Sequence, residues 1–167
     1  MKISRRTFIT AGVLGAAALA TAGWLRGPHA PGSGIARRAL DADAEANVDP
    51  NIPVMLAYAL PSAHQDRTPA IARTLAAVDA AIAGLPPAAR AELAQLFALL
   101  ALPPVRMGLA GVAQPWPAAS ATDVRRFLDR FRDSSWTLLR SAYDAMHQLV
   151  FAAWYSDPRA WPAIGYP

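Results

Sequence analysis

The chain has 167 residues, which suggests one domain that is long enough to bury a core without disulfides. It contains no cysteine, which excludes disulfides, thiolate metal sites, iron–sulfur clusters and covalent haem attachment through C-x-x-C-H. The formal net charge is +4, but without Lys2, Arg5 and Arg6 the chain has thirteen basic and twelve acidic residues. A body so close to neutral gives no argument for a nucleic-acid partner.

The first 25 residues have the pattern of an export signal, because a short basic region precedes a moderate apolar run. Residues 4–10 read S-R-R-T-F-I-T and resemble the twin-arginine signal. The run that follows is rich in glycine and alanine and therefore only weakly hydrophobic, which favours the route that exports folded proteins. Arg5, Arg6 and Phe8 are the predicted export-signal residues, the twin-arginine translocase is the predicted partner, and the periplasm is the predicted location.

The fate of this leader stays open. Ala20-Thr21-Ala22 is a small-x-small cleavage site ahead of Gly23. The apolar run from Phe8 to Leu25 has 18 residues, at the lower limit for spanning a bilayer, so an uncleaved inner-membrane anchor is the alternative. The predicted organisation is a signal segment over 1–25, a linker over 26–48 and a helical domain over 49–167.

Helical patterns follow one another through the domain. Residues 53–60 predict one or two helical turns, and Thr68-Pro69 predicts a helix start that Gly84 terminates. This helix carries one apolar stripe, formed by Ile71, Leu75, Val78 and Ile82. A second helix is predicted over 88–102, and its apolar half, 96–102, is expected to be surrounded by protein.

Residues 105–117 are rich in turn formers and predict a connection or a lid. Ser120 and Asp123 then form a pattern like a capping box. The short helix that follows has a buried stripe, predicted at Val124, Phe127, Leu128 and Phe131. Its other side carries arginines and aspartates, which we interpret as a solvated face with weak ion pairs.

The last predicted helix runs from Ser135 to Ser156. About half of its circumference is apolar, wide enough to pack against two neighbours, which predicts that it is the central helix. The predicted apolar stripe is Trp136, Leu139, Tyr143, Met146, Val150 and Ala153, with Leu138, Ala142, Ala145 and Leu149 beside it. Strand-like alternation persists nowhere, so the predicted class is all-α: a compact bundle of about four to five helices with an aromatic C-terminal tail.

The polar face of this helix becomes aromatic in its last two turns, and an aromatic tail follows. Two interpretations stand beside each other. The tail folds back on the helix as an intramolecular mini-core, or the aromatic side chains form a surface shared with another protein. The predicted partner-binding residues are Phe151, Trp154, Tyr155, Trp161 and Tyr166.

The sequence presents no chemistry of its own. The histidines, His29, His64 and His147, have no metal-ligand spacing, and His147 is interpreted as a packing or hydrogen-bonding residue. Neither a nucleophile elbow nor a G-x-G-x-x-G motif is found. We therefore predict no catalytic, cofactor-binding or metal-binding residue in the chain.

The closing stretch resembles a known family. The resemblance lies in Ser134-Ser135-Trp136, in Arg140-Ser141-Ala142-Tyr143, in the segment from Ala152 to Pro158 and in the segment from Trp161 to Pro167. These segments are similar to the small subunit of membrane-associated FAD-dependent sugar and polyol dehydrogenases, in particular the gluconate 2-dehydrogenase subunit 3 group. That group also opens with a twin-arginine leader.

The resemblance implies a non-catalytic subunit. Its partner would be a large flavoprotein of the glucose-methanol-choline (GMC) oxidoreductase type, which holds the FAD, and a multihaem cytochrome c subunit is a further implied partner. The small subunit would bind the folded flavoprotein in the cytoplasm and carry it through the translocase. The alternatives are a free-standing periplasmic binding protein and a membrane-anchored structural protein with an uncleaved leader.

Overall fold

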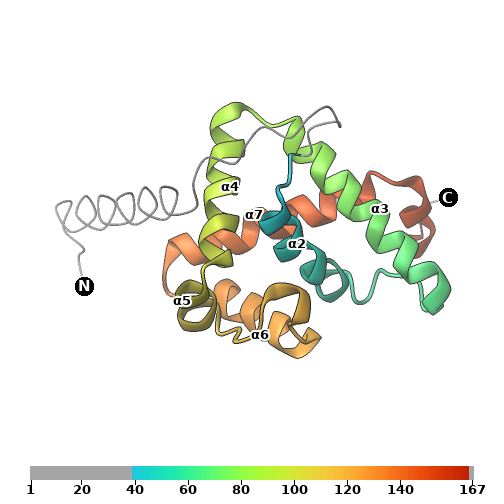
Figure 1. The fold of residues 1–167 in the computed structure, drawn as a ribbon. Helices are drawn as coiled ribbons and strands as arrows, with labels where there is room; N and C mark the ends of the chain where they lie inside the picture. The colour runs from blue at the N-terminus through green and yellow to red at the C-terminus, as the bar shows by residue number, and fades with distance from the viewer. Residues whose placement is uncertain (1–38, 166–167) are drawn as a thin grey trace. The chain divides into compact units, whose positions relative to one another are not determined.

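The computed structural model describes residues 39–165, and every regular element among them is a helix (Figure 1). The predicted all-α class is therefore confirmed. The five long helices are α2 (Ala42–Met55), α3 (His64–Ala83), α4 (Pro87–Ala101), α6 (Ala121–Arg132) and α7 (Thr137–Tyr155). The short elements are α5 (Pro103–Val105), the π-helical turn η1 (Arg106–Ala110) and the 3-10 helices η2 (Trp116–Ala118) and η3 (Pro158–Ile164).

Helix α2 lies in the middle of the bundle and packs against α3, α4, α6 and α7. Its N-cap is Asp41, whose Oδ1 accepts a hydrogen bond of 2.8 Å from the backbone N–H of Ala44. The predicted linker over 26–48 therefore extends too far, because residues 42–48 are the first half of a core helix. α7 packs against α2, α3 and α6, so α2 shares the central position predicted for α7 alone.

The sequence of α2 does not indicate that this helix is buried. Pro50 and Pro53 lie inside the helix, and prolines argue against a helix interior. Two of the residues on its buried face are asparagines, Asn47 at 0% and Asn51 at 2% exposure. Nδ2 of Asn51 donates to the backbone oxygen of Asn47 at 2.6 Å. A face that mixes alanine, asparagine and valine has no apolar period, so only its tertiary contacts make it core.

Helix α3 begins at His64, ahead of the predicted start at Thr68. Its N-cap is Ala63, which forms no side-chain cap, and the expected N1 residue Pro69 lies inside the helix. The predicted end is confirmed, because the N–H of Gly84 donates to the carbonyls of two residues in the last turn. Of the predicted stripe, Val78 and Ile82 are buried, whereas Ile71 and Leu75 are half-buried.

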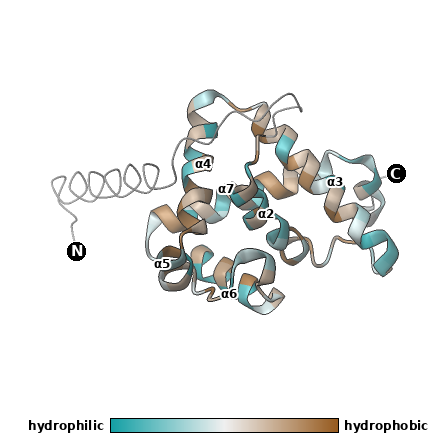
Figure 2. Cartoon of the chain, viewed as in Figure 1, coloured by the Kyte–Doolittle hydropathy of each residue, from teal (hydrophilic) through white to brown (hydrophobic). Residues whose placement is uncertain are grey.

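Helix α4 is less enclosed than predicted. Within the apolar half, only Phe97 and Leu100 are buried, and the neighbouring leucines are half-buried. The reason is that α4 packs mainly against α2 and the following turn, while Leu93 and Leu96 face a cavity of about 560 Å³ that α7 also lines. Figure 2 shows that hydrophobic residues recur around α4 and α5.

Helix α6 agrees with its prediction. Oγ of Ser120 accepts from the N–H of Asp123 at 3.1 Å and donates to its Oδ2 at 2.7 Å. The predicted stripe is buried throughout, at Val124, Phe127, Leu128 and Phe131. Trp116 of η2 packs edge-on against Phe127 at 5.0 Å between ring centroids and donates from Nε1 to the backbone oxygen of Leu100 at 2.9 Å. The predicted connection over 105–117 thus contributes a core tryptophan.

Helix α7 has 19 residues and ends at the tail. Leu139, Met146 and Val150 are buried as predicted, but Trp136 is 63% exposed and Leu138 is 76% exposed. Both lie at the start of the helix, ahead of Leu139, which is the first buried residue of the stripe. After α7 the chain turns into η3, which contacts α7.

Candidate partner interface

Four aromatic side chains line one face of α7 at intervals of four residues, the spacing that places side chains above one another on a helix. We call Tyr143, His147, Phe151 and Tyr155 the aromatic ladder. The ring centroids of Tyr143 and His147 are 5.6 Å apart, and those of His147 and Phe151 are 4.2 Å apart, both in stacked geometry. Phe151 and Tyr155 follow at 6.2 Å in a tilted arrangement.

All four ladder residues are half-buried. Each ring therefore packs against the core on one side and keeps another part in solvent. The sequence predicted an aromatic face only in the last two turns of the helix, from Phe151 onward. In the structure the aromatic face starts at Tyr143, a residue of the predicted core stripe, and includes His147. The constant spacing of four between these rings was the signal that could have found it.

The predicted partner-binding residues divide into three groups. Phe151 and Tyr155 belong to the ladder. Trp154 is 7% exposed, so it is a core residue and not a surface anchor. Its Nε1 is buried without a hydrogen-bond partner among the described residues. Trp161 is half-buried, and Tyr166 lies outside the described residues, as do Arg5, Arg6 and Phe8 of the export signal.

The tail is tied to the end of α7. Nε1 of Trp161 donates to the backbone oxygen of Tyr155 at 3.0 Å, and Ala160 is buried. Asp157 caps η3 by accepting from the N–H of Arg159 at 3.0 Å, and it also pairs with Arg73 of α3 at 3.2 Å. These contacts support the intramolecular mini-core for the tail, while the ladder beside it stays partly open.

A cavity of about 250 Å³ lies next to the first two rings of the ladder. It is lined by the end of α2 with the following turn, by α6 and by Tyr143 and His147. Its charged side chains are already paired in part, because Arg132 contacts Asp129 at 3.1 Å and Asp133 at 2.9 Å. The hydrogen bond to Asp133 raises the pKa of Arg132, and the same contact lowers the pKa of Asp133.

Tyr58 stands at the rim of this cavity and is fully exposed. The aromatic ladder thus continues into a rim with a free tyrosine and a charged border. Aromatic rings on a rigid helix, framed by charged side chains, are the composition of an interface core with a polar rim. This arrangement suits contact with a protein surface.

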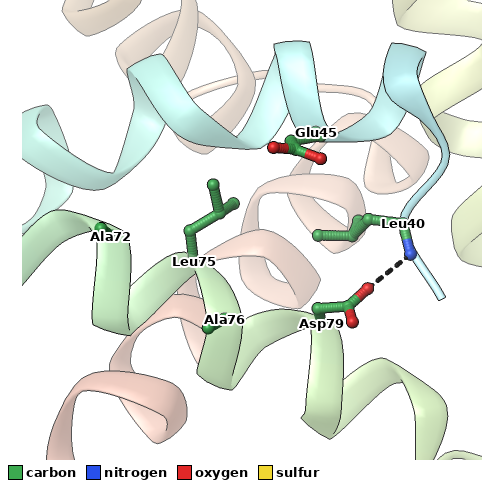
Figure 3. Close-up of a pocket in the computed structure, with 6 residues that line it drawn as sticks. All are labelled: Leu40, Glu45, Ala72, Leu75, Ala76 and Asp79. Carbon is green, nitrogen blue, oxygen red and sulfur yellow. Dashed lines mark hydrogen bonds between the residues drawn. The ribbon is translucent and has the colours of Figure 1, made fainter. Parts of the chain in front are cut away.

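A further cavity, of about 320 Å³, lies between α2 and α3 (Figure 3). Oδ1 of Asp79 accepts from the N–H of Leu40 at 2.8 Å, which fixes the entry of the chain into α2. Glu45 and Leu75 also line it, and Figure 3 shows Glu45 extending from α2 on the opposite side from Asp79. In residues 39–165 no three His, Asp or Glu side chains form a group that could hold a metal ion.

No protein-family model, curated protein or solved structure matches the chain. The features of the chain that bear on its function are the leader, the closing stretch with its resemblance and the aromatic ladder.

Proposed function

We propose that the chain is the non-catalytic small subunit of a periplasmic or membrane-bound FAD-dependent dehydrogenase of the GMC type, acting on a sugar, polyol or sugar acid. It binds the catalytic flavoprotein and carries it across the inner membrane by the twin-arginine route. The flavoprotein holds the FAD. The observation that carries the proposal is the aromatic ladder, four partly exposed rings on a helix whose other side is core.

The ladder has the properties of an affinity anchor. Tyr143, Phe151 and Tyr155 are large rings with two side-chain torsions, so fixing them costs little conformational entropy. Stacking on His147 and on one another restricts them before a partner arrives. Binding then removes apolar ring surface from water without much ordering, which is how a few aromatic residues dominate interface energetics.

The chemistry of the body also suits export in the folded state. The chain has no cysteine, so its folding needs no oxidation in the periplasm. A helical bundle rich in local contacts folds fast compared with β-rich folds. A small subunit of this kind can fold in the cytoplasm, bind a partner there and cross with it.

The test is co-expression of the flavoprotein subunit alone, with this chain, and with an Arg5→Lys, Arg6→Lys variant. The variant keeps both charges, so a merely electrostatic role of the leader would survive it. We expect active flavoprotein in the periplasm only with the unchanged chain, and complex retained in the cytoplasm with the variant. Equal periplasmic activity in all three cases would refute the proposal.

A further inference from the structure

The chain makes a sharp bend where α4 ends. α4, Pro87–Ala101, and the following segment, Pro103–Ala110, meet at 78°. No single helix among the described residues is long and apolar enough to cross a membrane, but this bent pair passes the same test of length and composition together. Figure 2 shows hydrophobic residues at α5 and at the adjoining end of α4. The bend is therefore apolar in composition and is not a polar connection.

We call the exposed and half-buried side of this bend the apolar corner. It consists of Leu99, Leu102, Pro103, Pro104, Val105, Met107, Gly108 and Leu109. Met107 is 56% exposed, one of the few large apolar side chains within residues 39–165 that are so open to solvent. The sequence has no acidic residue between Glu92 and Asp123, and Arg106 is the only charged residue in that interval.

Two residues of the corner lack a backbone donor, and Arg106 bonds to carbonyls that follow it in the chain. Pro103 and Pro104 have no N–H to satisfy. Arg106 donates from its guanidinium to the carbonyls of Val112 and Ala113, each at 3.3 Å. Such satisfaction matters because an unpaired backbone group is costly in an apolar surrounding.

Arg130 of α6 adds a second cation at the same place. Its guanidinium donates to the carbonyl of Leu109 at 3.5 Å. It also lies 3.0 Å from the position that a Cβ on Gly111 would occupy. Gly111 has φ +75°, so a glycine is needed both for the backbone conformation and for the approach of Arg130. The corner therefore combines apolar side chains with two arginines that donate to backbone carbonyls at or beside it.

We infer that the apolar corner inserts into the headgroup region of an anionic lipid bilayer. Apolar side chains that dip below the headgroups, bordered by arginines, are the pattern by which proteins bind a membrane surface without crossing it. As a binding surface for a protein, this corner is less suitable than the aromatic ladder. The corner has no exposed aromatic anchor, since Trp116 beside it is buried at 3% exposure.

The inference does not rest on the proposed function. A protein with the same corner would bind lipid whether or not it carries a flavoprotein. Both arginines hold backbone carbonyls, so their replacement would also disturb the fold. The decisive readout must therefore be local to Met107 and must leave Arg106 and Arg130 in place.

The experiment uses the full chain, whose lack of cysteine allows one label at a chosen site. Met107→Cys carries an environment-sensitive fluorophore, and vesicles carry a nitroxide-labelled lipid as quencher. The matched control is Ile164→Cys, an apolar residue that is 59% exposed. It lies in η3, the last described element, which is drawn near the C-terminus and away from α5 (Figure 1). Because the apolar leader can itself bring the chain to the vesicle, the readout is the ratio of quenching at the two sites.

We expect strong quenching at position 107 and weak quenching at 164 on phosphatidylcholine vesicles that contain phosphatidylglycerol. The label at 107 should be quenched less on vesicles of phosphatidylcholine alone. Leu102→Ser in the labelled chain should weaken the contact by about tenfold, from lost apolar burial. Equal quenching at both sites, or none at 107, overturns the inference. Shielding of the label at 107 by the flavoprotein but not by lipid overturns it in favour of a protein contact.

Discussion

The most informative substitution in the ladder is Phe151→Ala. Phe151 stacks on His147 at 4.2 Å and is half-buried, so the change removes a ring that faces both the core and solvent. If its open side is the partner contact, the dissociation constant should rise about thirtyfold, equivalent to about 2 kcal/mol. The free energy of unfolding should fall by about 2 kcal/mol, which is less than the loss expected for a fully buried phenylalanine.

The matched control is Val150→Ala, one position earlier on the same helix. Val150 is 2% exposed and faces the core, so the loss of two methyl groups should lower the free energy of unfolding by about 2 kcal/mol as well. Affinity for the flavoprotein should not change. The assays are urea unfolding and calorimetric titration of the purified subunits. Equal loss of affinity in both variants, or in neither, would refute the assignment of the ladder to the interface.

Three predictions concern the body of the protein. Trp154→Phe should change the free energy of unfolding by no more than about 1 kcal/mol in urea titrations, because it removes a buried N–H that has no hydrogen-bond partner within residues 39–165. Trp154→Ala should cost about 4 kcal/mol. Ser120→Ala should cost about 1 kcal/mol in the same assay and reduce the helicity of α6, since it deletes the cap. The third concerns pH. The hydrogen bond from the N–H of Arg159 lowers the pKa of Asp157 in the folded protein. The ionised Asp157 carboxylate therefore stabilises the fold above the ordinary aspartate pKa, and this stabilisation is lost as the pH falls through the lowered pKa. The difference in urea midpoint between the wild type and Asp157→Asn should therefore be full at pH 6 and shrink toward pH 3, and a constant difference would contradict this.

The elements predicted best are those whose signals are local. Ser120 predicts the start of α6 because its cap is a contact between residues only three positions apart. The buried stripe that follows has the regular spacing of a helix. Gly84 ends α3 for a similar reason. The burial of helix α2 could not be predicted, because it depends on neighbours from α3, α4, α6 and α7 that surround a face containing Asn47 and Asn51.

The site was predictable in its chemistry but not in its exposure. Phe151, Trp154 and Tyr155 are adjacent or nearly adjacent in sequence and equally aromatic, yet Trp154 points to the core while the other two are partly open. That difference depends on where α3, α6 and η3 cover α7. For Trp136 and Leu138 the error is the opposite: the sequence places them in or beside the buried stripe, whereas they are 63% and 76% exposed.

The account's central claim is that the ladder binds the flavoprotein. Hydroxyl-radical footprinting of the free chain and of the reconstituted complex tests it most directly, since it reports solvent access ring by ring. We predict that oxidation of Phe151 and Tyr155 falls several-fold in the complex, while Trp136, which is 63% exposed and lies at the far end of α7, is oxidised equally in both states. Unchanged oxidation of Phe151 and Tyr155 in a complex shown to be intact would contradict the claim.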